Sequence, residues 1–309
     1  MTHRTRATAA LLVILAALLA MVGLAGSPAA ASYPGNDGRV VFVRMNQIYT
    51  IRPTGGSVHQ LTSAGKNYRP HWSPDGTRIA YIHEAPPGSR DIWVMRADGT
   101  HKQQVTHIGQ VTGATWSPDG ATLAFGGFDA TENHMVLQTV SAVAPFGTPT
   151  VLLGYHDDPS TLEALWLDQD GTPAWNANGS TLAYYSAFFP SSPDHYMIVL
   201  DLASKFYDAV DAIGGSCCGE GSFADPAYSP AGELGYTRTI DPSASKLYAP
   251  GITLTKPHDG QLAFSPAGTR IIFVNDSSGT PNVIIAKRDG TNRHVLVTNG
   301  YQPDWQPLH

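Results

Sequence analysis

Three histidines occupy similar places in successive copies of a repeated pattern, and imidazole is a common metal ligand and proton carrier near neutral pH. They are His83, His134 and His195, and Glu84 and Arg90 lie close to the first of them in the sequence. If the three imidazoles meet at one point, the sequence predicts a metal-dependent lyase or hydrolase. If they lie apart they are exposed loop residues, which the unequal loop lengths favour.

A second group of candidate metal ligands is acidic. Asp168, Asp170 and Gly171 have the opening spacing of a calcium-binding loop, whose carboxylate oxygens suit a hard cation. No acidic residue follows at the position that would close such a loop, so a solvated acidic loop is the favoured interpretation. We therefore expect no cofactor, with calcium or another divalent metal as the alternative.

Cys217 and Cys218 are the only cysteines and are adjacent within a glycine-rich stretch. Two free thiols are unusual in an exported protein, so we expect a vicinal disulfide that stiffens this loop. Adjacent Cα atoms lie about 3.8 Å apart, which is short for a disulfide, and the glycines on both sides would ease that strain. Redox chemistry, metal binding and an intermolecular bridge are the alternatives.

Two common catalytic signatures are absent from the sequence. It contains neither a Gly-x-Ser-x-Gly nucleophile elbow nor a His-Glu-x-x-His zinc pair. The recurring serines, such as Ser73 and Ser117, belong to a repeated turn motif, and we interpret them as structural. No standard nucleophilic or zinc hydrolase site is therefore predicted.

Residues 1–31 have the order of a secretory signal peptide. Arg4 and Arg6 precede an uncharged run rich in Leu and Ala, and small residues then lead to a predicted cleavage after Ala31. No other stretch reaches the roughly 18 apolar residues that a membrane helix needs. The sequence predicts an exported protein, periplasmic, cell-wall-associated or secreted, with no membrane span after cleavage.

The predicted mature chain is mildly acidic. Removing Arg4 and Arg6 from 19 basic residues leaves 17 against 25 acidic ones, which is a formal charge of 17 − 25 = −8. The chain has no block of Lys and Arg, so nucleic acid is not a predicted partner. Its 31 glycines and 23 prolines, with only 14% charged residues, indicate many short strands and turns.

An internal repeat determines the predicted architecture. An aromatic residue, Ser-Pro-Asp-Gly and an alternating apolar run recur at residues 72–82 and 116–125, and weaker copies start at Trp175, Tyr228 and Phe264. Pro presets φ in the turn and Gly accepts a positive φ, so each copy predicts a hairpin. Two further apolar segments follow most copies, which gives four antiparallel strands per repeat.

Six repeats close into a ring if the two ends of the chain share one of them. The recurring aromatic residues, which we expect to pack between blades, are Trp72, Trp116, Trp175, Tyr228, Phe264 and Trp305. The chain ends four residues after the last of these, and residues 37–43 supply the missing continuation. The sequence predicts an all-β, six-bladed β-propeller of four-stranded antiparallel blades, closed by a C-terminal inner strand with three N-terminal outer strands. We expect residues 32–309 to form this single domain.

This repeat resembles that of TolB-type propellers, whose signature is the aromatic-Ser-Pro-Asp-Gly turn followed by an Ile-Ala-Phe-like strand. The resemblance covers essentially the whole mature chain and implies the fold; a scaffold signature leaves the function open. Asn176 and Ala177 replace Ser-Pro in one copy, and Ala231 and Ala267 replace the turn Asp in two others. Only seven residues precede the first predicted strand, so we expect a propeller without the α/β domain that precedes it in TolB.

The candidate binding residues lie in loops predicted on one face of the ring. If each first strand runs from an upper to a lower face, the loops that enter first strands and join second to third strands share the upper face. Variable loops on a rigid scaffold usually carry binding sites. The predicted upper-face binding residues are Tyr68, Arg69, His83, Glu84, Arg90, His134, Asp168, Asp170, His195, Asp225 and Arg238.

The combination of a complete scaffold, elaborated loops and no catalytic constellation predicts a non-catalytic binding propeller. Its expected partner is an envelope or extracellular protein, peptide or glycan, and the protein is expected to be a monomer. The metal-dependent lyase or hydrolase remains the alternative.

Overall fold

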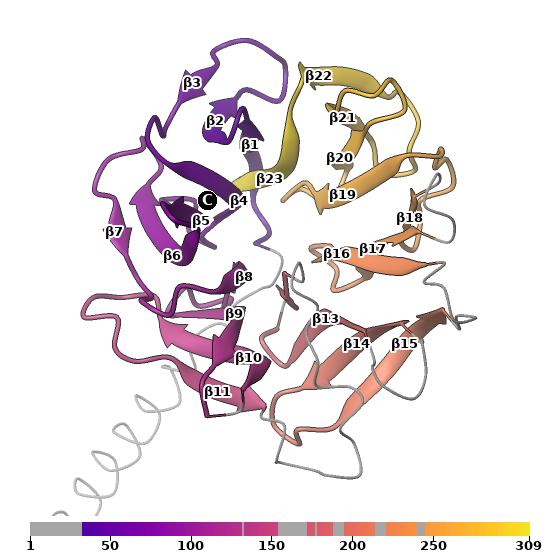
Figure 1. Cartoon of the computed structure of the whole chain (residues 1–309). Helices are drawn as coiled ribbons and strands as arrows, with labels where there is room; N and C mark the ends of the chain where they lie inside the picture. The colour runs from indigo at the N-terminus through magenta and orange to yellow at the C-terminus, as the bar shows by residue number, and fades with distance from the viewer. Residues whose placement is uncertain are drawn as a thin grey trace, which may run out of the picture.

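The structure is a computed structural model that describes residues 33–131, 133–153, 172–176, 178–187, 195–213, 221–239 and 245–309. Six antiparallel sheets surround a central channel, and the chain passes from each sheet to the next around the ring (Figure 1). The predicted all-β, six-bladed propeller is confirmed, and no helix within the described ranges could span a membrane. The predicted signal peptide, Asp168, Asp170, Cys217 and Cys218 lie outside the described residues.

Four of the blades have four strands, numbered here outward from the channel. Blade 2 contains β4 (Lys66–Trp72), β5 (Arg78–Ala85), β6 (Ser89–Arg96) and β7 (Gln103–Gln104). Blade 3 contains β8 (Val111–Trp116), β9 (Thr122–Asp129), β10 (His134–Ser141) and β11 (Thr150–Leu153). Blade 4 contains β12 (Ala174–Trp175), β13 (Thr181–Ala187), β14 (His195–Asp201) and β15 (Tyr207–Ile213). Blade 6 contains β19 (Asp259–Phe264), β20 (Arg270–Asn275), β21 (Asn282–Lys287) and β22 (His294–Thr298).

Blade 1 joins the two ends of the described chain, as predicted. Its strands are, from the channel outward, β23 (Tyr301–Leu308), β1 (Asn36–Arg44), β2 (Gln47–Ile51) and β3 (His59–Gln60). The yellow β23 lies beside the indigo β1 in Figure 1, and Trp305 is opposite Val40 in their register. Asp37 also receives hydrogen bonds from Arg270 of blade 6, with a closest N to O distance of 2.6 Å. The ring is therefore closed by both strand pairing and an ion pair.

Blade 5 departs from the prediction of four strands. Among the described residues it has only β16 (Ser222–Tyr228), β17 (Leu234–Thr239) and β18 (Ser245–Tyr248). Elsewhere a threonine at the outer edge accepts a hydrogen bond from the third strand, as Thr106 does from Ile92 at 2.9 Å. Thr255 makes the same contact with Leu247 at 3.1 Å. The motif of the fourth strand is thus retained where its ladder is absent.

The repeated turn is a network of hydrogen bonds at the lower face. The Ser117 hydroxyl donates to Asp119 at 2.5 Å, and Asp119 also accepts from the backbone N–H of Ala121 at 3.0 Å. These hydrogen bonds lower the pKa of Asp119, because they stabilise its ionised form. Gly120 has a φ of +69°, a conformation that side chains with a Cβ rarely adopt. The Ser-Pro-Asp-Gly motif therefore has the local role that its sequence predicts.

The recurring aromatic residues pack between blades, as expected. Trp72, Trp116 and Trp305 are 1%, 0% and 2% exposed. The guanidinium of Arg78 in blade 2 lies 4.6 Å from the Trp116 ring centroid in blade 3, which adds a cation–π contact between the blades. Trp175 of blade 4 is the exception, since it is only half-buried and lines the channel cavity.

Candidate functional site

The inner strands carry a bulge three residues before the recurring aromatic residue. The bulge residues Arg69, Asp225, Gln261 and Gln302 all have positive φ, between 48° and 56°. The ladder shifts register beside each of them, so the strand bends and its pairing no longer dictates where that side chain points. A positive φ in residues other than glycine is uncommon, and its repetition in four blades indicates a built feature.

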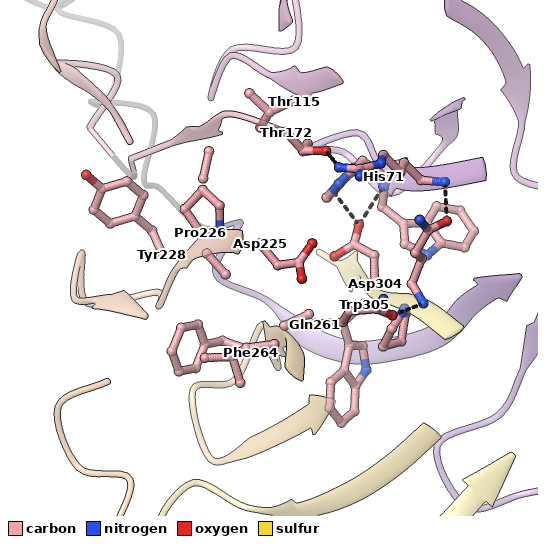
Figure 2. Close-up of a pocket in the computed structure, with 18 of the residues that line it drawn as sticks. His71, Thr115, Thr172, Asp225, Pro226, Tyr228, Gln261, Phe264, Asp304 and Trp305 are labelled. Carbon is pink, nitrogen blue, oxygen red and sulfur yellow. Dashed lines mark hydrogen bonds and ion pairs between the residues drawn. The ribbon is translucent and has the colours of Figure 1, made fainter. Parts of the chain in front are cut away.

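Two rings of side chains follow from this geometry. We call the residues three positions before each recurring aromatic residue the upper ring: Arg69, Gly113, Thr172, Asp225, Gln261 and Gln302. We call those one position before it the lower ring: His71, Thr115, Ala174, Ala227, Ala263 and Asp304. Every member of both rings except Gly113 lines one cavity of about 120 Å³ in the channel (Figure 2).

Hydrogen bonds between neighbouring blades hold the upper ring in place. Gln261 accepts from the backbone N–H of Gln302 at 2.6 Å through its side-chain oxygen, and Gln302 accepts from the N–H of Arg69 at 2.8 Å. The Arg69 guanidinium passes blade 3 and donates to the hydroxyl of Thr172 in blade 4. Gly113 makes this possible, because a Cβ at that position would collide with the Thr172 side chain.

The lower ring has a polar half and an apolar half. Asp304 of blade 1 accepts from the backbone N–H of Trp72 at 2.8 Å, and the same oxygen lies 3.6 Å from the His71 Nδ1. Thr115 extends this polar half to blade 3. The corresponding residues of blades 4, 5 and 6 are all alanines. Figure 2 shows the carboxylates of Asp225 and Asp304 directed into the space between these two halves.

Tyr33 forms the lower end of the cavity. Its hydroxyl donates to the Trp116 carbonyl at 3.0 Å, and its ring also borders a separate hollow on the lower face beside Pro74 and His309. Burial raises the pKa of Tyr33 far above its ordinary value, and the negative charge of Asp304 adds to the effect. Tyr33 is therefore neutral at physiological pH, and a ligand would enter from the upper face.

Of the predicted binding residues, the structure brings Arg69 and Asp225 together in the channel cavity. The three histidines lie on second and third strands and do not line it. His83 packs on Trp93 with ring centroids 5.1 Å apart, and burial lowers the pKa of His83. His195 contacts the Tyr185 hydroxyl, and His134 lies opposite Asp129. Within the described ranges no three His, Cys, Asp or Glu residues are placed to hold a metal ion.

The remaining predicted residues form two further groups. Glu84 pairs with Lys66 at 2.6 Å, and burial together with the Glu84 charge raises the pKa of the neighbouring Tyr68. Arg90 is opposite Glu84 in the β5–β6 register, so these residues share the upper edge of blade 2. Arg238 belongs to the interface of blades 4 and 5, where it lies 3.6 Å from Asp211 and packs over aromatic rings.

The sequence-based prediction missed His71, Gln261, Gln302 and Asp304. A usable signal was present, because each lies one or three positions before a recurring aromatic residue. The prediction looked instead to the ends of second strands, where loops are longer. Strand alternation alone does not predict that both positions face the channel, since the bulge between them changes the alternation.

No protein-family model and no curated protein sequence matches the chain. The structure is similar to that of TolB from Acinetobacter baumannii, with a TM-score of 0.68 and 16% identity over 87% of this chain and 67% of that one. A chain of a nidogen/laminin complex gives 0.61 and 7% identity over 87% of this chain and 98% of that one. An oligogalacturonate lyase from Vibrio parahaemolyticus gives 0.51 and 12% identity over 86% of each chain. Identities this low establish a common fold and leave function open. The chain therefore has the six-bladed propeller fold of the TolB proteins.

Proposed function

We propose that this protein is an exported, non-catalytic binding propeller that recognises an envelope protein, peptide or glycan through the upper mouth of its channel. The observation that carries the proposal is the upper ring, in which five of six side chains are polar and neighbouring blades hold them in place. Polar groups that are ordered before binding lose little entropy when the ligand arrives. We further propose that the propeller acts as a monomer in the periplasm, at the cell wall or outside the cell.

The fold supports this proposal without deciding it. One similar chain belongs to a complex named for nidogen and laminin, whereas another is a lyase. The alternative of a metal-dependent lyase or hydrolase relied on His83, His134 and His195. These residues lie one or two strands outside the channel cavity, so the geometry does not favour that alternative.

Photo-crosslinking in intact cells tests the binding function. A photoreactive benzoylphenylalanine replaces Tyr68, which adjoins Arg69 on the upper face, and the matched control places it at Phe206, which is 70% exposed before the outermost strand of blade 4. We expect the position at the mouth to capture a specific envelope component that the control position does not. Ala227→Phe, which fills the cavity without changing its charge, should reduce capture by about tenfold.

Equal capture from both positions would contradict the proposal. So would capture that a folded Ala227→Phe protein leaves unchanged, because the partner would then bind outside the channel. Thermal unfolding of the substituted protein establishes that it is folded.

A further inference from the structure

Two glutamines on the same strand use their side chains differently. Gln306 accepts from the backbone N–H of Arg39 at 3.0 Å and donates its amide nitrogen to the Gly76 carbonyl at 2.8 Å. Gln302 likewise accepts a backbone N–H, that of Arg69, but its amide nitrogen has no hydrogen-bond partner among the described residues. Both side chains are held by a neighbouring blade, and only Gln302 keeps its donor available in the cavity.

Gln261 repeats the arrangement of Gln302. Its oxygen accepts the backbone N–H of Gln302, and its amide nitrogen also lacks a partner within the described ranges. Other glutamines that are not exposed donate to backbone carbonyls, as Gln47, Gln104 and Gln138 do. Because the backbone donor defines which end of each amide is the oxygen, the amide nitrogens of Gln261 and Gln302 are oriented donors.

These donors form an arc with Arg69 on the adjacent blades 6, 1 and 2. Acceptors stand on the other side of the same cavity, with the carboxylate of Asp225 on blade 5 and that of Asp304 in the lower ring. Counting neutral His71, the four ionisable side chains of the rings carry a net charge of −1. A free carboxylate would face two acids, and a free ammonium would face Arg69. A neutral ligand that donates and accepts many hydrogen bonds suits this mixture better.

The apolar half of the lower ring defines the shape of such a ligand. Ala174, Ala227 and Ala263 present only C–H groups, which suit the C–H face of a ring and offer no deep pocket for a large side chain. None of the large exposed hydrophobic residues within the described ranges lines the cavity, whereas the centre of a protein interface is usually rich in them. A cavity of about 120 Å³ with an open upper end has room for a single sugar ring.

We propose that the channel cavity binds one neutral pyranose unit of a glycan, with Gln261, Gln302 and Arg69 donating to its oxygens and Asp225 accepting from its hydroxyls. The inference rests on the proposed binding function and narrows it to one ligand class. A protein segment at the same mouth is the competing outcome of the test.

Saturation-transfer NMR on the purified mature protein tests the inference with small probes. The probes are the methyl glycosides of glucose, galactose, mannose and N-acetylglucosamine, and a capped Ala-Lys-Ala peptide represents a protein segment. We expect at least one glycoside to bind at millimolar concentration and the peptide not to bind. Gln302→Ala should weaken glycoside binding by about tenfold, whereas the matched Gln306→Ala, which lies outside the cavity, should change it by less than about twofold.

The outcomes separate this inference from the proposed function. Binding of none of the four glycosides, or equal weakening by the two substitutions, overturns the sugar inference. If the glycosides fail while photo-crosslinking from position 68 still captures a protein in a Gln302-dependent manner, the binding function stands and its ligand is a protein. If the glycosides fail and crosslinking captures no specific component, both proposals fall.

Discussion

The two ends of the innermost strands differ in how they use polar side chains. At the lower end, Gln306, Asp37 and Asp119 satisfy backbone groups or a partner on the adjoining blade. At the upper end, Gln302 and Gln261 are held equally firmly, but their amide nitrogens have no partner among the described residues. The difference teaches that one strand can stabilise the ring at one end and offer a binding surface at the other.

Removing residues 300–309 should have the largest effect, because it deletes β23 and with it every contact of the lower and upper rings in blade 1. The exposed edge of β1 and the unfilled channel should prevent cooperative folding. We expect aggregation or loss of the cooperative transition in calorimetry. A propeller that is closed elsewhere would instead retain a single transition.

Trp305→Ala should come next, since it removes a side chain that is 2% exposed between two blades. We expect a loss of about 3–5 kcal/mol in the free energy of unfolding, measured by denaturant titration. Trp175→Ala is the matched control, because that ring is half-buried beside the cavity and should cost clearly less. Equal losses would mean that the aromatic residues of blades 1 and 4 have the same structural role.

The glutamine pair tests the comparison most directly. Gln306→Ala removes two hydrogen bonds and should cost about 1–3 kcal/mol of unfolding free energy, whereas Gln302→Ala removes one and should cost about 1 kcal/mol. The order should reverse for ligand binding. A Gln302→Ala protein that loses more stability than Gln306→Ala would show that the upper end is structural as well.

The smallest effect is expected from Asp119 in a lower-face turn. Its pKa in the folded protein is lowered by the Ser117 hydroxyl and the Ala121 N–H. Its contribution to stability is therefore present above its unfolded pKa of about 3.9 and is lost as the pH falls through the lower folded value. Asp119→Ala should cost less than about 1 kcal/mol at pH 7, because solvent screens this partly exposed carboxylate. Unfolding free energies of the two proteins should converge as the pH drops to 3; a constant difference would contradict the assignment.

The fold was predictable because its causes are local and repeated. Pro and Gly specify each hairpin, and the alternating apolar residues specify which face of each strand is buried, so six copies define six sheets. The closure of blade 1 followed from the same repeat, since residues 37–43 continue the motif that ends after Trp305. The fourth strand of blade 5 was predicted wrongly, because the terminal threonine motif persists there without a ladder.

The candidate site was predictable only in part. Arg69 and Asp225 were selected because they stand at the start of inner strands, and both line the cavity. His83, His134 and His195 were selected for their chemistry, but their strands place them away from the channel. Gln302 is invisible to such a search, since glutamine is not a typical catalytic or metal-binding residue and Gln306 looks the same in sequence.

The sequence by itself determined the repeat, the number of blades and the strand that closes the ring, because each depends on short-range turn geometry and on the pattern of apolar residues. Only the tertiary structure decided which polar side chains meet in the channel. Bulges rotate Arg69, Asp225, Gln261 and Gln302 toward the axis, and the partner that holds each one comes from another blade, often more than forty residues away. Contacts of that range arise only when the ring closes, and they separate a glutamine that stabilises the fold from one that is free to bind.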